Sequence, residues 1–395
     1  MKNLWPDPLA YPAERLFCLD VLRGLDIFFL TMLGPFVKYG WFKVFKPSEA
    51  GDLFWKHSLT SFASPGCVPT GWGIWDFGQP LFIFICGAAV PFAIPRRLDV
   101  KGRPTAAFWK HVLGRFVMLW CLGMLIRGIL TFDLSKFTPY SDTLQTIAVA
   151  YLFAALSMLI RRRWLRFVLA LLAIGLSAVV MEMFGDYTRL GNVARLVDEA
   201  VFGAIGAKAK DFCYVFTTIV WGAMGVLGAL TGEIVKAKED AWIRAAKLAV
   251  WGMSSYAFGR VLGIWIPPIR YIYTVSFVFQ SLGLSILCLD VLFVLTDILR
   301  WRRGLGFFLL MGQFTLFMWM LSTFFRPALT VLAKHLVCGL PMLAGTDRYQ
   351  PIAEHAAIAV IMAVLAILRY RASVRTNCET ETGRCEVRAD ARGRG

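Results

Sequence analysis

The hydrophobic residues of this chain gather in long runs, and short polar stretches separate the runs. A helix needs about 20 mostly apolar residues to cross the hydrocarbon layer of a membrane, which is about 30 Å thick. Ten runs have this character, at residues 20–38, 76–95, 110–132, 143–160, 164–184, 213–235, 243–264, 271–298, 305–325 and 352–370. A shorter stretch at 327–341 is typical of an interfacial or re-entrant helix. The pattern predicts an all-α polytopic membrane protein with about ten transmembrane helices, or eleven with the shorter stretch.

The charged residues give these predicted helices a direction. Five connections are rich in Lys and Arg, near residues 96–103, 161–166, 236–247, 300–303 and 369–375. They alternate with connections that are longer or poorer in net positive charge, at 39–75, 133–142, 185–212, 265–270 and 326–351. Short basic loops of membrane proteins remain in the cytoplasm. We therefore predict that both termini are cytoplasmic and that the second set of connections lies outside.

Composition narrows the class of protein further. The chain has 395 residues, of which 58% are hydrophobic and 17% charged, and this excludes an ordinary soluble globular protein. Its net charge of +16 comes largely from the loops between apolar runs, so we expect membrane lipid and no nucleic acid as a partner. We predict a single transmembrane domain at 1–371 and a polar, disordered tail at 372–395. The absence of any N-x-S/T site favours a bacterial inner membrane over a glycosylated compartment.

The connection 39–75 and the run that follows it carry polar groups suited to acid–base chemistry. His57, one of four histidines, lies in this connection, and Asp76 and Gln79 open the next run. An imidazole exchanges protons near neutral pH. A carboxylate at a helix N-terminus is also an ordinary cap, and a lone histidine in a loop is more often structural. From these residues alone, capping is the favoured interpretation of Asp76.

Further polar residues lie near the outer ends of the predicted helices. Asp142 and Gln145 are one turn apart at the start of the run 143–160, and Arg270 and Ser276 follow the sequence "IPP". Arg127 and Arg260 approach the same side from the runs 110–132 and 243–264, and Asp290 lies inside the run 271–298. Ionisable groups within a membrane usually face a cavity or each other. These residues predict a polar cavity that opens away from the cytoplasm, for either catalysis or transport.

Glycines line one face of the run 213–235. Gly222, Gly225, Gly228 and Gly232 follow each other at steps of three, three and four residues. Close helix packing is the favoured interpretation, and a smooth wall along which a long ligand slides is the alternative. The nine cysteines and four histidines show no metal-ligand spacing, so we expect no metal.

The segment "RLFCLDVLRGLD" places Asp20, Arg23 and Asp26 at the cytoplasmic start of the first run. On a helix, Arg23 is one turn from both carboxylates, so the three groups partly neutralise one another. Anchoring at the membrane surface is a sufficient explanation for any one of them, and we expect Asp20 to hold Arg23 in place.

Two motifs resemble those of the heparan-α-glucosaminide N-acetyltransferase family, which has bacterial relatives that carry a domain of unknown function. "RLFCLDVLRG" resembles the family's R-L-x-S-x-D-x-x-R-G opening. "DFGQPLFIFICGAAVPFA" resembles its D-L-x-x-P-x-F-x-F-x-x-G-x-x-x-P segment, with matches at Asp76, Pro80, Phe82, Phe84, Gly87 and Pro91.

Weaker similarities extend over residues 13–371. "DTLQTIAVAY" is similar to V-L-Q-R-L-G-V-x-Y, with Thr146 in place of Arg, and "GALTGEIV" to G-V-x-A-G-x-x-L. "PPIRYIYTVS" resembles P-x-x-K-x-L-W-T-x-S, with Arg270 in place of Lys. "GQFTLFMW" is similar to G-x-N-S-x-x-V-Y, with Phe314 in place of Asn.

The resemblance implies a membrane-embedded acetyltransferase. Such a protein takes acetyl-CoA as co-substrate from the cytosol and passes the acetyl group to an amino sugar or other glycan acceptor on the far side. It implies that His57 is the catalytic histidine, supported by Asp76, Asp142 and Gln145. The acceptor would then meet Trp72, Arg270 and Ser276. The residues expected to bind acetyl-CoA are Arg23, Arg97, Arg103, Arg162, Gly228 and Gly232, the arginines because guanidinium forks suit phosphates.

Two other functions fit the same pattern of helices. One is a permease for a sugar or amino sugar, and the other is a catalytically inactive scaffold for envelope polysaccharide assembly. A homodimer is compatible with any of the three. Cys67 and Cys338 both fall in predicted outer connections, where a disulfide between them is able to persist.

Overall fold

The computed structural model describes residues 6, 16–41, 73, 76–126, 140, 142–188, 191–203, 213–339 and 349–393, with side chains up to residue 373. The chain divides into two compact units, one formed by Met1–Lys46 with Arg302–Gly395 and the other by Pro47–Trp301. We call them the terminal unit and the central unit. The hydrophobic pattern indicates no boundary at these positions, and a single domain over 1–371 stays a prediction.

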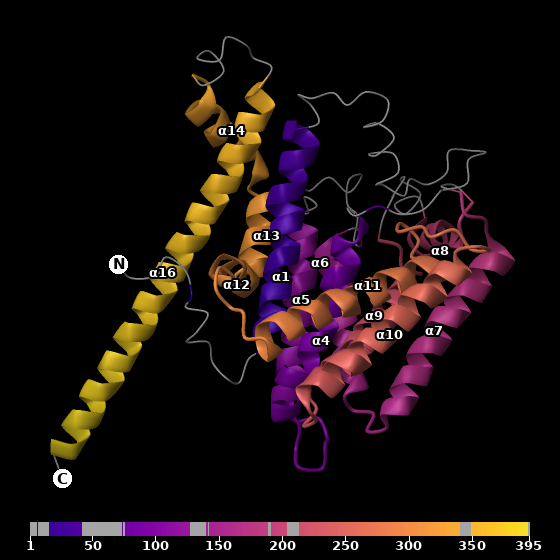
Figure 1. Ribbon diagram of the computed structural model, residues 1–395, viewed down its shortest axis with the longest axis horizontal. Helices are drawn as coiled ribbons and strands as arrows, with labels where there is room; N and C mark the ends of the chain where they lie inside the picture. The colour runs from indigo at the N-terminus through magenta and orange to yellow at the C-terminus, as the bar shows by residue number, and fades with distance from the viewer. Residues whose placement is uncertain are drawn as a thin grey trace. The chain divides into compact units, whose positions relative to one another are not determined.

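The central unit is a bundle of apolar helices (Figure 1). In chain order its main helices are α4 (Gly78–Ala93), α5 (Ala106–Ile126), α6 (Thr143–Ser157), α7 (Arg163–Phe184), α8 (Val193–Phe202), α9 (Thr218–Lys236), α10 (Ala241–Leu262) and α11 (Val275–Phe293). A 3-10 turn, Pro95–Arg97, follows α4, and a π-helical segment, Val294–Ile298, extends α11. Among the described residues there is no strand, only an isolated bridge between Leu98 and Pro104.

Helix α9 forms the core of this unit because its glycines allow neighbouring backbones to approach closely. A Cβ on Gly225 would lie 2.4 Å from the carbonyl oxygen of Ala150 in α6, and a Cβ on Gly232 would lie 2.2 Å from that of Ala88 in α4. On the α4 side, Gly87 meets the backbone of Gly225 in the same way. The glycine face therefore serves helix packing, as the favoured interpretation predicted. A role for Gly228 and Gly232 in binding acetyl-CoA stays a prediction, although the backbone of α4 covers the face that a ligand would need.

The terminal unit combines the two ends of the chain. Helix α1 (Phe17–Phe28) continues through the π-helical segments η1 (Phe29–Leu33) and η2 (Phe36–Trp41). Helices α12 (Gly306–Gln313) and α13 (Thr315–Thr323) meet at a bend of 77°, and α14 (Arg326–Val337) and the long α16 (Gln350–Gly393) follow (Figure 1). Backbones of α1 and α12 touch at Gly24 and Gly312: a Cβ on Gly24 would lie 1.7 Å from the carbonyl oxygen of Phe308.

Each of the ten predicted runs contains a helix, which confirms the all-α class for the described residues. In the described part of the chain, five helices are long and apolar enough to cross a membrane: Ala106–Ile126, Arg163–Phe184, Thr218–Lys236, Val275–Ile298 and Gln350–Ser373. The bent pair α12 and α13 makes a sixth if it is one span. Helices α4 and α6 are apolar but shorter. Ten spans and cytoplasmic termini stay predictions.

The predicted charge trio in α1 is only partly correct. Arg23 Nη1 contacts Asp20 Oδ1 at 3.0 Å, as expected. Asp26, by contrast, is buried, and neither of its carboxylate oxygens has a hydrogen-bond partner among the described residues. Asp26 does not join this pair because it lies among the buried residues of α1, whereas Arg23 is partly exposed.

Candidate functional site

Asp76 lies immediately before α4 and is fully buried. Its Oδ2 accepts a hydrogen bond from the backbone N–H of Gly73 at 2.9 Å, and its own N–H donates to the Gly73 carbonyl at 3.0 Å. Its Oδ1 lies 3.4 Å from Arg270 Nη1. Phe77, the residue at the N-cap position of α4, supplies no side-chain cap. The partners of Asp76 are thus a turn and an arginine, which goes beyond the capping role that the sequence favoured.

The loop between α10 and α11 positions Arg270. Thr274 closes this loop, because its hydroxyl accepts from the Ile269 N–H and donates to the Pro267 carbonyl, both at 2.9 Å. Tyr273 adopts a positive φ of 52°, which turns the chain sharply before α11 begins. The Arg270 guanidinium lies 4.7 Å from the ring centroid of Tyr271, so one face of the cation is covered by an aromatic ring.

Aromatic side chains pack against one another in this part of the central unit. Tyr140 stacks on Trp120 with centroids 5.1 Å apart and meets Trp221 edge-on at 5.9 Å. Trp221 in turn meets Tyr273 at 5.5 Å. The Tyr140 hydroxyl is 2.9 Å from Thr218 Oγ1, and burial raises the pKa of this phenol well above its usual value. A phenol of this kind remains protonated at physiological pH and serves as a hydrogen-bonding group.

Asp142 and Gln145 occupy the start of α6 as a capping box. The Asp142 carboxylate accepts from the Leu144 N–H at 2.9 Å, and the Gln145 side chain accepts from the Asp142 N–H at 3.1 Å. Gln79 in α4 donates to Thr146 Oγ1 at 3.3 Å, and this bond joins the starts of α4 and α6. Asp142 and Asp76 therefore lie at the same end of the central unit. Ser276 is nearby in sequence to Arg270, and its hydroxyl is 3.3 Å from that of Thr274.

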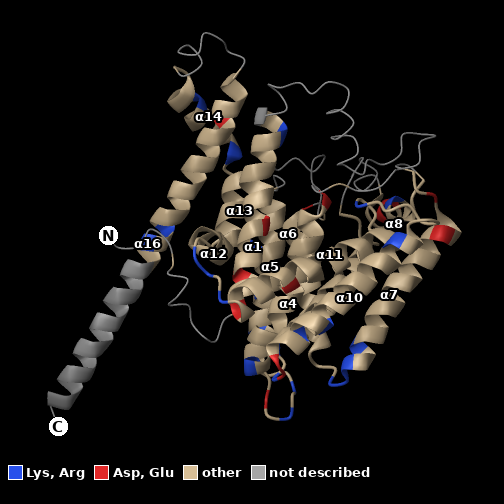
Figure 2. Cartoon of the chain, in the orientation of Figure 1, with Lys and Arg blue, Asp and Glu red and all other residues tan. Residues whose placement is uncertain are grey.

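The opposite end of the central unit is basic. Glu233, near the end of α9, accepts a hydrogen bond from Arg166 Nη1 at 2.7 Å and forms an ion pair with Arg163, whose Nε lies 2.8 Å from Oε2. Lys236 donates to the Pro91 carbonyl in α4 at 2.7 Å, and Arg161 donates to the Lys101 carbonyl. These contacts bring the turns after α4, α6 and α9 together, and Figure 2 shows Lys and Arg where α4 and α7 meet these turns.

A pocket of about 290 Å³ lies among these basic turns. Its lining residues come from the ends of α4, α6 and α9 and the start of α7: Pro91, Pro95, Met158, Arg163, Glu233, Lys236 and Ala237. Helix α4 separates this pocket from Asp76, since the carboxylate precedes the first residue of the helix and Pro91 lies near its end. The central unit thus has a basic end with a pocket and, at the other end, an ion pair whose carboxylate is buried.

The remaining predicted site residues fall into three groups. Arg97 donates to the Ala93 carbonyl, the backbone N–H of Arg103 donates to Asp99 at 2.6 Å, and Arg162 precedes α7, so all three belong to the basic end. Arg23 lies in the terminal unit and pairs with Asp20. His57 and Trp72 lie outside the described residues. Cys67 also lies outside the described residues, and Cys338 is an exposed free thiol, which contradicts the predicted bridge between them.

Sequence reasoning identified Asp76 and Arg270 but did not pair them, and it missed Glu233 altogether. Glu233 stands one residue after Gly232 in "GALTGEIV", and a carboxylate in an apolar run was the available signal. Among the described residues, no group of His, Cys, Asp and Glu gathers in a way that would hold a metal ion. Neither models of known protein families nor curated protein sequences match this chain.

Proposed function

We propose that this protein is an integral-membrane acyltransferase that moves an acetyl group from cytosolic acetyl-CoA to an amino sugar or other glycan acceptor on the far side of a bacterial inner membrane. The observation that carries the proposal is the pair formed by Asp76 and Arg270. These residues belong to two of the segments that resemble the heparan-α-glucosaminide N-acetyltransferase family, and they meet in space. A fully buried carboxylate beside a guanidinium is a typical feature of a functional site.

In this proposal His57 accepts the proton of the acceptor amine as the nitrogen attacks the thioester carbonyl. The C–N bond forms, the C–S bond breaks, and the proton returns from the imidazole to the departing thiolate. Asp76 orients the imidazole and fixes its tautomer, as a carboxylate does in a catalytic triad. Arg270 pairs with Asp76 and, with Gln145 and Ser276, provides donors for the oxyanion of the tetrahedral intermediate.

The basic end of the central unit supports the binding of the acyl donor. Coenzyme A carries a diphosphate and a further phosphate, and guanidinium groups bind such oxyanions through paired hydrogen bonds. Arg163 and Lys236 line the 290 Å³ pocket there, and Arg97, Arg103 and Arg162 belong to the adjoining turns. We propose that the phosphates remain at this end while the acetyl-bearing arm enters the helix bundle.

The test is transfer of labelled acetyl groups from acetyl-CoA to a panel of amino sugars by the purified protein in proteoliposomes. We expect Asp76→Asn to lower the rate by about 10²-fold, since the acid–base group loses its orienting carboxylate. Arg260→Gln is the matched control, because Arg260 is an exposed arginine near the outer end of α10. Full activity of both Asp76→Asn and His57→Ala would exclude the assigned roles.

A permease for a sugar or amino sugar is the second candidate, and features of the terminal unit favour it. Transporters use interrupted membrane helices, and π-helical turns are frequent at functional sites. Here α12 and α13 meet at 77°, and two π-helical segments follow the buried carboxylate of Asp26. Uptake of labelled amino sugar without acetyl-CoA, abolished by Asp26→Asn, would establish this function. Acetyl transfer that persists in Asp26→Asn would favour the first.

A further inference from the structure

A cluster of cationic and aromatic side chains lies where η2, α14 and α16 meet in the terminal unit. The His355 imidazole stacks on the Tyr39 ring with centroids 5.8 Å apart and planes 28° from parallel. The Arg326 guanidinium lies 5.1 Å from the centroid of the same ring, and Lys38 Nζ lies 5.0 Å from it. We call Lys38, Tyr39, Arg326 and His355 the Tyr39 cluster.

Among the described side chains of the terminal unit, basic residues outnumber acidic ones. The described side chains of the terminal unit include three carboxylates, and two of them, Asp20 and Asp26, are in α1. The third, Glu354, accepts a hydrogen bond from Gln350 at 2.7 Å. No described carboxylate forms an ion pair with Arg326, and its guanidinium lies over the Tyr39 ring. An arginine in this position retains its donors for a ligand that carries negative charge.

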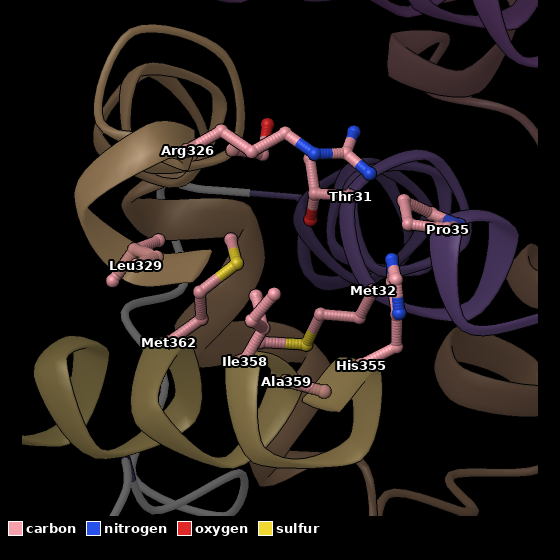
Figure 3. Close-up of a pocket in the computed structure, with 10 residues that line it drawn as sticks. Thr31, Met32, Pro35, Arg326, Leu329, His355, Ile358, Ala359 and Met362 are labelled. Atoms are coloured by element: carbon pink, nitrogen blue, oxygen red, sulfur yellow. The ribbon is translucent and has the colours of Figure 1, made fainter. Parts of the chain in front are cut away.

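A small void adjoins the cluster and has a volume of about 10 Å³, enough for one water-sized group. Figure 3 shows Arg326 and His355 reaching toward it from α14 and α16, opposite Thr31 and Pro35. The Thr31 hydroxyl donates to the Ile27 carbonyl at 2.7 Å. The hydroxyl of Ser322, another lining residue, donates to the Trp319 carbonyl at 3.0 Å. Their protons are therefore engaged, and Arg326 remains the strongest donor beside the void.

A backbone contact fixes the orientation of the His355 imidazole. Its Nδ1 is 2.9 Å from the Pro351 carbonyl, which only accepts, so Nδ1 carries a proton. The His355 ring and the Arg326 guanidinium thus lie against the same Tyr39 ring.

We propose that the Tyr39 cluster binds an oxyanion, namely the carboxylate, phosphate or sulfate of a small acidic sugar or of a lipid headgroup. One oxygen of the anion occupies the void, and a second forms the other arm of a paired hydrogen bond with the Arg326 guanidinium. Lys38 adds positive charge on the Tyr39 ring, and the His355 imidazole stacks on the same ring. This site is independent of acyl transfer and adds a ligand of defined chemistry to whichever function the central unit performs.

The test uses the full-length protein in nanodiscs of phosphatidylcholine, titrated with D-glucuronate or D-glucose in a calorimeter. We expect glucuronate to bind and glucose not to bind. Arg326→Gln should weaken glucuronate binding about tenfold or more, since a charge-assisted hydrogen bond is lost, whereas Arg326→Lys should retain part of it. The matched control is Lys334→Gln, an exposed lysine on the same helix that does not line the void.

A second arm identifies the source of the anion. Nanodiscs that also contain phosphatidylglycerol are examined by native mass spectrometry for retained lipid. Preferential retention of phosphatidylglycerol that is lost in Arg326→Gln assigns the oxyanion to a lipid headgroup, and glucuronate binding assigns it to a soluble ligand. The proposal is wrong if neither anion binds better than its neutral counterpart, or if Arg326→Gln binds both as the wild type does. No acetyl donor is present, so the outcome does not depend on acyl transfer.

Discussion

At the scale of single residues, the ion pair of Asp76 and Arg270 is unequal in its exposure to solvent. The Asp76 side chain is 0% exposed, whereas that of Arg270 is 22% exposed. Removing a charge from water is costly unless a partner compensates it, and water still reaches part of the guanidinium. The carboxylate therefore depends on the arginine more than the arginine depends on the carboxylate.

This asymmetry predicts the outcome of a double-mutant cycle on the free energy of unfolding. Arg270→Gln should destabilise the protein by about 3 kcal/mol, since it leaves a buried carboxylate without its described cation, and Asp76→Asn by about 1 kcal/mol. The double variant should lose less than the sum, because the penalties arise from the same pair. Thermal unfolding in detergent measures all four proteins. Equal losses for the two single variants would show that burial does not determine the cost.

The sequence indicates which residues belong to this site, but it does not indicate which of them contact each other. Asp76 and Arg270 stand out because ionisable groups are rare in apolar runs, but no local pattern shows that a loop before α11 reaches the start of α4. For Asp142, by contrast, the sequence does indicate a contact, because the three-residue spacing from Asp142 to Gln145 is that of a capping box. A polar pair at a helix start satisfies backbone groups first, whatever further role it has.

At the scale of helices, Glu233 joins the start of α7 to the end of α9. Arg166 is 4% exposed and donates to both carboxylate oxygens of Glu233, at 2.7 and 3.0 Å. Arg163 adds a third contact from the same helix. Since two cations share one carboxylate, the removal of its charge leaves both without compensation.

We therefore expect Glu233→Gln to destabilise the protein by about 3 kcal/mol, the cost of a buried charge that loses its partner. The matched control is Glu239→Gln, which removes the carboxylate from an exposed pair with Lys247 and should cost less than about 0.5 kcal/mol. Thermal unfolding of both variants in the same detergent makes the comparison. A control loss as large as that of Glu233→Gln would contradict the assignment.

The glycine face of α9 gives a second prediction at this scale. Gly225→Ala places a Cβ 2.4 Å from the Ala150 carbonyl oxygen, so α6 and α9 must separate, and we expect a loss of about 1–3 kcal/mol. Gly175→Ala in α7 meets nothing within 4 Å and should be neutral or stabilise the protein by up to about 1 kcal/mol through helix propensity. The two unfolding midpoints should therefore move in opposite directions, and a lower midpoint for Gly175→Ala would be inconsistent with its open surroundings.

At the scale of the whole molecule, the positions of helices follow from hydrophobic runs, but their interruptions do not. Each run contains a helix because a continuous apolar segment must satisfy its own backbone hydrogen bonds in a membrane. The bend at Phe314 and the π-helical segments after Phe28 arise from local packing that average hydrophobicity does not record. The same limitation applies to the division into two units, which depends on contacts between distant parts of the chain.

The charge pattern gives a prediction for the orientation of the central unit in the membrane. In a variant that lacks the nine native cysteines, Lys101→Cys should react with an impermeant thiol reagent only from the cytoplasmic side, and Trp265→Cys only from the outer side. Both positions are exposed, so access to the reagent does not limit the result. Labelling of both from one side would overturn the predicted alternation of the loops.

The shortness of α4 has a consequence for the energetics of the proposed reaction. Its 16 residues span about 24 Å between the basic pocket and Asp76, less than the roughly 30 Å of hydrocarbon in a membrane. If the phosphates of the donor stay at the basic end, only a neutral acetyl group passes through the transmembrane voltage. Acyl transfer should then be insensitive to the membrane potential, whereas a carrier that moves one charge gains or loses about 2.3 kcal/mol per 100 mV.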